Sequence, residues 1–161
     1  MPLRTFELFH GAVLAKLVRQ DRPTTLRLIE TKPSDSWATY RINDEVNLLI
    51  KHSANPRHPK REPDAAAWQF TFTPEQLKQV TPPGTWAAPV CGSFEPDSRQ
   101  MEVWLLDPLQ VAQLLFLDRV EPQSVTVKRL PGRRLSVTRT RFGEELIVAW
   151  DRLEKWAVPG S

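Results

Sequence analysis

The sequence has few of the residues on which cofactor and metal motifs depend. It contains six glycines and one cysteine among 161 residues. The glycines are not clustered, so no glycine-rich phosphate loop is present, and no CxxC or HExxH spacing indicates a zinc site. A single cysteine, Cys91, excludes a disulfide within the chain and favours a reducing compartment. Because Cys91 lies in an apolar segment, we expect it in the core rather than acting as a nucleophile.

Long hydrophobic runs are also missing. No segment approaches the ~18 consecutive apolar residues of a membrane-spanning helix. Residues 1–4 are not followed by the apolar stretch that a signal peptide requires. We therefore expect a cytoplasmic protein without a membrane partner, and the sequence leaves its oligomeric state open.

What the chain does contain is typical of a globular domain. Hydrophobic residues make up 40% of it and charged residues 25%, close to ordinary usage, and its length suits one domain over residues 1–161. Fifteen prolines indicate many rigid turns. Most of the six tryptophans lie in or beside apolar runs. This favours positions in the core over exposed positions where the rings would stack on bases.

Periodicity predicts an α+β fold. Apolar residues at helical spacing indicate a helix over 5–20, capped by Thr5, and one over 108–117, capped by Asp107; Thr73-Pro74 indicates a short third helix. The expected strands are 24–30, 37–42, 46–52, 68–72, 86–91, 101–106, 124–130, 134–141 and, as strand or short helix, 146–150. Asn43-Asp44-Glu45 and Pro131-Gly132 are expected to form hairpin turns. This order favours a mixed, mostly antiparallel sheet with helices packed on one side. Residues 54–67 are expected to form a mobile basic loop, and residues 157–161 a frayed tail.

The most distinctive segment is the apolar strand that ends in Lys51. A lysine that closes a buried run either marks the point where the strand reaches the surface or has a partner there. The order of a helix followed by three strands, with a lysine on the third, resembles the restriction-endonuclease-like PD-(D/E)xK core. The segments 42–53 and 68–72 also resemble a group of small bacterial proteins of no known function, and that likeness implies no activity.

The nuclease resemblance implies a set of catalytic residues. Lys51 would be the motif lysine, Asp44 or Asp35 the first acid, and Glu7 an accessory acid. The position two residues before Lys51 is Leu49 rather than an acid, so Glu30 would be a migrated replacement. Under this interpretation Asp44 and Glu30 would hold Mg²⁺ or Mn²⁺; otherwise no cofactor is expected.

Positive charge is concentrated in two short stretches that contain no acid. We expect both to contact the phosphate backbone of nucleic acid, with DNA favoured over RNA. The alternative is that the same charges protect a sheet edge from aggregation. The predicted binding residues are Arg57, Lys60 and Arg61 in the loop and Lys128, Arg129, Arg133, Arg134, Arg139 and Arg141 in the hairpin.

The sequence is therefore compatible with three hypotheses about function. The first is a nucleic-acid-binding protein, and the second is a divergent metal-dependent nuclease. The third is a protein-interaction subunit, for which we expect an exposed apolar patch. The nuclease hypothesis requires Glu30, Asp44 and Lys51 to meet in one cleft.

Overall fold

The computed structural model describes residues 1–54, 56–58, 60–61, 66–93, 102–130, 134–139, 145–149 and 151–156. The helices are α1 (Thr5–Val18), α2 (Pro74–Val80) and α3 (Pro108–Leu114), with one 3-10 turn, η1 (Pro33–Asp35). The strands are β1 (Leu26–Lys32), β2 (Trp37–Ile42), β3 (Val46–Ser53), β4 (Ala67–Phe72), β5 (Trp86–Cys91), β6 (Glu102–Val103), β7 (Gln123–Leu130), β8 (Arg134–Arg139) and β9 (Glu145–Ala149). The predicted Pro131-Gly132 turn, Arg133, Arg141, Trp150 and the tail from residue 157 lie outside the described residues.

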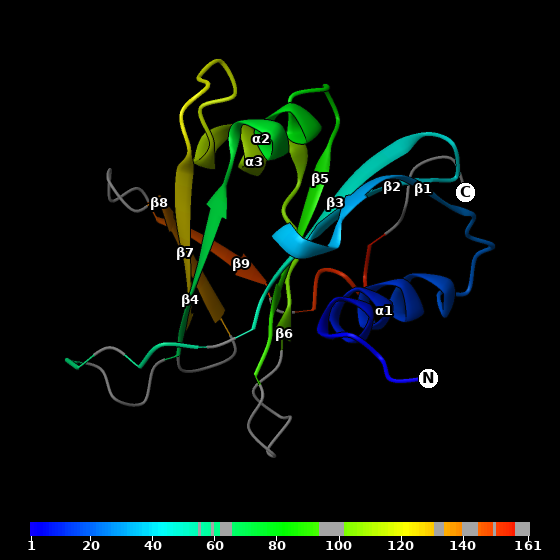
Figure 1. The fold of residues 1–161 in the computed structure, drawn as a ribbon, viewed down its shortest axis with the longest axis horizontal. Helices are drawn as coiled ribbons and strands as arrows, with labels where there is room; N and C mark the ends of the chain where they lie inside the picture. Colours follow the sequence, from blue (N-terminus) through cyan, green and yellow to red (C-terminus); the bar gives the residue numbers. More distant parts are fainter. Residues whose placement is uncertain are drawn as a thin grey trace.

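The strands form two sheets. One has the order β1-β2-β3-β5-β6, in which β3 and β5 run parallel and the other pairs run antiparallel. The second is antiparallel throughout, in the order β4-β7-β8-β9. Figure 1 shows the second sheet on the left and the first running from the middle to the upper right, with α1 beneath β1 and β2 at the lower right.

Each face of the five-stranded sheet is covered by a different layer. Alternate β3 residues Leu48 and Ile50 pack with α1, while Leu49 packs with the four-stranded sheet and with α2 and α3. The continuous apolar run of β3 thus reflects burial on both faces, as predicted. Trp37, Trp68 and Trp104, each at most 1% exposed, lie in the core as predicted.

The α+β class and the mostly antiparallel pairing are confirmed. The strands divide between two sheets rather than forming one, and α1 lies on the opposite face of the five-stranded sheet from α2 and α3. The physical reason is that β3 and β5 present apolar side chains on both faces, so both faces need a cover. Among the described residues, no helix has the length and apolar character to cross a membrane.

Local signals placed most element ends correctly. The Thr73 side chain caps α2 by accepting from the backbone N–H of Gln76, and Asp107 caps α3 in the same way. Asn43 and Asp44, in the three-residue turn between Ile42 and Val46, have positive φ angles of 52° and 56°, a left-handed conformation that asparagine and aspartate tolerate. Helix α1 begins after Arg4 rather than being capped by Thr5.

Candidate functional site

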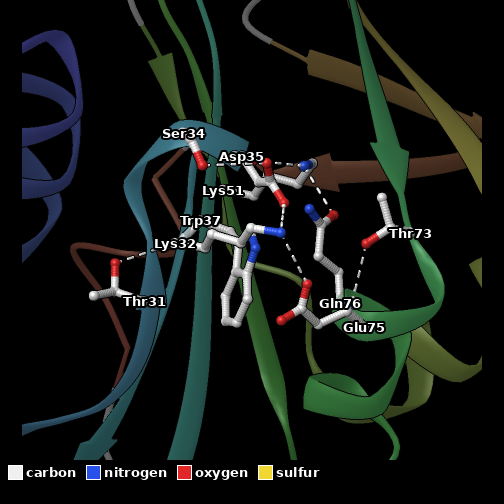
Figure 2. A network of polar contacts seen from close by, with 9 residues as sticks. All are labelled: Thr31, Lys32, Ser34, Asp35, Trp37, Lys51, Thr73, Glu75 and Gln76. Atoms are coloured by element: carbon white, nitrogen blue, oxygen red, sulfur yellow. Dashed lines mark hydrogen bonds and ion pairs between the residues drawn. The ribbon is translucent and has the colours of Figure 1, made fainter.

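Lys51 lies inside the protein, on the face of β3 that turns toward α2. Its side chain is 8% exposed. The amine donates to Oε1 of Gln76 at 2.9 Å and to the backbone oxygen of Asp35 at 3.4 Å. Figure 2 shows this amine held between η1 and the first turn of α2. Lys51 therefore has partners at the strand end, and both are neutral groups.

The nearby carboxylates are paired with a different lysine. The Lys32 amine lies 2.8 Å from a carboxylate oxygen of Asp35 and 3.3 Å from one of Glu75 (Figure 2). Register explains this, because Lys32 pairs with Trp37 and Trp37 pairs with Lys51. The two lysines thus occupy one row, two strands apart, and only the outer one forms ion pairs among the described residues.

No carboxylate in the described part of the chain pairs with the Lys51 amine, and its burial without such a partner changes its chemistry. Desolvation lowers the pKa of its amine from 10.5 to about 8, and the more distant Asp35 carboxylate opposes this only in part. A charged amine in such surroundings is costly, so a substantial fraction of Lys51 is neutral slightly above physiological pH. Buried lysines of this kind can act as bases or phosphate ligands only where a substrate reaches them.

The neighbouring His52 points to the opposite face and meets a second histidine. Nδ1 of His52 lies 3.1 Å from Nε2 of His10 on α1. Phe6 stacks on His10 with ring centroids 3.9 Å apart. Burial, followed by the charge of His52, lowers the pKa of His10 to about 3, and burial also lowers the pKa of His52. Two neutral imidazoles therefore join α1 to β3.

Of the acids predicted for the nuclease site, Asp35 lies beside Lys51, with its carboxylate paired to Lys32, whereas Asp44, Glu30 and Glu7 lie elsewhere. Asp44 lies in the β2–β3 turn, where its carboxylate pairs with Arg27 at 3.3 Å. The strand from Val46 to Lys51 is about 16 Å long, so Asp44 and Lys51 lie far apart along β3. Glu30 is aligned with Thr39 and Leu49 rather than with Lys51, and accepts from Gln79 at 2.6 Å.

Glu7 lies on α1, beyond the opposite face of the five-stranded sheet. Its carboxylate accepts from the backbone N–H of Arg4 at 2.8 Å and so caps the helix. Within the described ranges, no three or more His, Cys, Asp or Glu side chains are grouped so as to hold a metal ion. The helix and strands that carry the nuclease resemblance are present in the expected order, but their polar side chains are dispersed.

Two of the predicted binding arginines, Arg129 and Arg139, make contacts within the protein. Arg139 is 9% exposed; its Nε donates to the backbone oxygen of Leu114 at 2.8 Å, its Nη2 donates to that of Gln113, and it lies 3.8 Å from the centre of the Phe116 ring. It satisfies carbonyl groups at the C-terminal end of α3. Arg129 pairs with Glu102 at 2.6 Å. Both arginines lie on core-facing positions of their strands.

The period-2 pattern of β7 and β8 carried a signal for these two arginines. Leu135, Val137 and Arg139 occupy alternate positions, as do Val127 and Arg129, and alternate residues share a face. Both arginines therefore alternate with buried apolar residues, a pattern that places them on the core face of their strands. The buried His10 also followed a visible pattern, because it extends the α1 stripe that contains Phe6 and Val13.

Of the remaining basic residues that the structure describes, Arg57, Lys128 and Arg134 lie on the outer face of the four-stranded sheet. An isolated antiparallel bridge pairs Arg57 with Ala67, and Ala67 pairs with Lys128. Residues directly opposite one another project to the same side of a sheet, so Arg57 and Lys128 share the outer face. Arg134, at an alternate position to Ser136, shares it as well. Arg57, Arg134, Lys60 and Arg61 are exposed.

The comparisons with known proteins give no relatives for this chain. No family model, no curated protein and no solved structure matches it. Only the geometry of the site therefore indicates what this protein does.

Proposed function

We propose that this protein binds nucleic acid through the outer face of its four-stranded sheet. The observation that carries the proposal is the row Arg57–Ala67–Lys128. It brings the two basic stretches, far apart in the sequence, onto one surface, with the backbones of Arg57 and Lys128 roughly 10 Å apart across two strand spacings. Clustered lysine and arginine side chains that share a face are what contact with a phosphate backbone requires.

The rest of this face supplies neutral hydrogen-bonding groups. Gln69 and Thr71 of β4 project outward, and Thr71 Oγ1 lies 3.2 Å from Oγ of Ser124. Hydroxyl and amide side chains are common phosphate and sugar contacts beside arginine and lysine. A face of this composition positions a backbone without selecting a sequence.

The aromatic residues of β4 favour a double-stranded partner. Trp68, Phe70 and Phe72 are all buried on the core side of the strand. Proteins that bind single strands stack bases on exposed rings, whereas the outer positions of β4 are Ala67, Gln69 and Thr71. We therefore expect duplex DNA to bind by its backbone, with weaker binding to single strands.

The test is a gel-shift assay with single- and double-stranded DNA and RNA, with EDTA or with Mn²⁺. We expect a salt-sensitive shift of duplex DNA in EDTA, weakened by Lys128→Gln and by Arg134→Gln. The matched control is Arg27→Gln, which removes one positive charge from an exposed side chain on β1 of the other sheet. An equal loss in all three variants would show that only net charge matters and would contradict the proposed surface.

A second candidate function has one specific observation in its favour. Leu28 and Ile29 are 52% and 50% exposed on β1, an edge strand of the five-stranded sheet. Exposed apolar residues on an unpaired edge suit a protein partner that adds a strand. If the gel-shift assay shows neither binding nor cleavage for any nucleic acid, this edge becomes the surface to test.

A further inference from the structure

Beside the basic row, the surface is hollowed between the end of β3 and the outer face of β4. The hollow has a volume of about 450 Å³ and is lined by Ser53, Ala54, Pro56, Arg57, Gln69 and Thr71. A volume of this size falls within the usual range of small-ligand sites. Most of its lining is polar, so it suits a charged or strongly hydrogen-bonding group rather than an apolar one.

The lining offers one cation and several neutral donors. Arg57 contributes a guanidinium with a fixed fork of N–H groups, and Ser53, Thr71 and Gln69 contribute two hydroxyls and an amide. None of the lining residues that the structure describes carries a carboxylate. A guanidinium surrounded by hydroxyl and amide donors is the arrangement that recognises phosphate oxygens.

The backbone holds Arg57 in place at this site. Its N–H donates to the carbonyl oxygen of Ala67 at 2.7 Å, and its own carbonyl accepts from the Ala67 N–H at 2.8 Å. Two short hydrogen bonds fix the start of the arginine side chain to β4, so less conformational entropy is lost when a ligand binds. The position is preorganised although Arg57 belongs to a long connection between strands.

We propose that this hollow binds the terminal phosphate of a nucleic-acid strand. The inference rests on the proposed function and makes its substrate more specific: a duplex end that carries a phosphate monoester. β4 is an edge strand of its sheet, and the row from Lys128 through Ala67 leads across it to Arg57 and the hollow. A duplex lying along this row places the end of one strand at the hollow.

The charge of a monoester explains the preference for an end. An internal phosphodiester carries a single negative charge and has two free oxygens, whereas a terminal phosphate carries nearly two charges and has three. The N–H and O–H donors of Arg57, Ser53, Thr71 and Gln69 outnumber the two free oxygens of a diester. The extra charge and the extra oxygen are therefore recognised here, while the rest of the face contacts diesters.

The experiment compares duplexes of one sequence that differ only in their ends. Fluorescence anisotropy measures binding of duplexes with a 5′-phosphate, a 3′-phosphate or two hydroxyl ends. We expect a terminal phosphate at one of the ends to tighten binding roughly tenfold, the effect of about one charge-assisted hydrogen bond. Arg57→Gln and Thr71→Val should abolish this preference, whereas Arg27→Gln on β1 should preserve it. Tryptophan fluorescence and circular dichroism establish that each variant is folded.

The outcomes separate this inference from the function on which it rests. Equal binding of all three duplexes by the wild-type protein would overturn the terminal-phosphate site and leave backbone binding intact. A preference that survives in Arg57→Gln would overturn the assignment to this hollow. Titration with a nucleoside monophosphate, followed by NMR, covers the case in which no duplex binds. Chemical-shift changes at Gln69 and Thr71 would support phosphate binding in the hollow but not duplex binding by the sheet. The absence of such changes would overturn both proposals.

Discussion

Replacing Lys51 by methionine should change how the stability of the protein depends on pH. Methionine has a similar length and fills the same space without a charge. In the folded protein the Lys51 amine loses its proton at a pKa of about 8, whereas in the unfolded chain it does so near 10.5. Between these values the unfolded state binds more protons than the folded state, so unfolding becomes harder as pH rises.

The size of the effect follows from the two pKa values. A tenfold change in an equilibrium corresponds to about 1.4 kcal/mol. The interval from about 8 to 10.5 therefore corresponds to about 3 kcal/mol as an upper limit, since the amine is slightly exposed. Below pH 8 the protein bears the whole cost of a buried charge, and above pH 10.5 it bears none of it.

The assay is urea unfolding of the wild-type protein and Lys51→Met at a series of pH values from 7 to about 10.5. The free energy of unfolding of the wild type, minus that of the variant, should rise with pH. Lys78→Met, on the exposed side of α2, is the control, because it removes a lysine amine that is not buried. A difference that stays flat or falls across this range would refute the account of Lys51 as a buried amine without a carboxylate partner.

Three further predictions follow from contacts around the two sheets. Arg139→Met should lower the free energy of unfolding by about 2 kcal/mol in a urea titration, because it leaves two helix-end carbonyls unpaired, and DNA binding by the folded variant should not change. Glu7→Ala should cost about 1 kcal/mol in the same assay through loss of the α1 cap; a loss of metal-dependent activity would contradict this role. The unfolded chain protonates His10 and His52 as pH falls below 6.5 while the folded protein resists, so stability should decline toward acid. His10→Phe should reduce that decline in thermal unfolding, and an unchanged decline would contradict the assignment.

Elements with their own local signals were predictable from the sequence. The cap and proline of α2, the cap and proline of α3 and the Asn43-Asp44 turn act over a few neighbouring residues, and the structure confirms all of them. The division of the strands into two sheets depends instead on pairings such as β4 with β7, which are distant in the sequence. Periodicity cannot specify such pairings.

The site residues were predictable only in part for the same reason. The sequence analysis identified Lys51 as unusual, but its partner Gln76 comes from a helix after an intervening strand. It also identified both basic stretches, but not the bridge at Arg57 that joins them. A carboxylate count near Lys51 could not show that Asp35 and Glu75 pair with Lys32, because ion pairing depends on which strands are neighbours.

The salt dependence of duplex DNA binding tests the central claim most directly. The logarithm of the affinity is plotted against the logarithm of salt concentration for the wild type, for Arg27→Gln and for the combined variant Arg57→Gln, Lys128→Gln and Arg134→Gln. Each lost phosphate contact should reduce the slope by about 1. The account predicts that the combined variant loses two to three units of slope, by this estimate, while Arg27→Gln keeps the wild-type slope. Equal slopes for all three proteins, or no binding by the wild type, would contradict it.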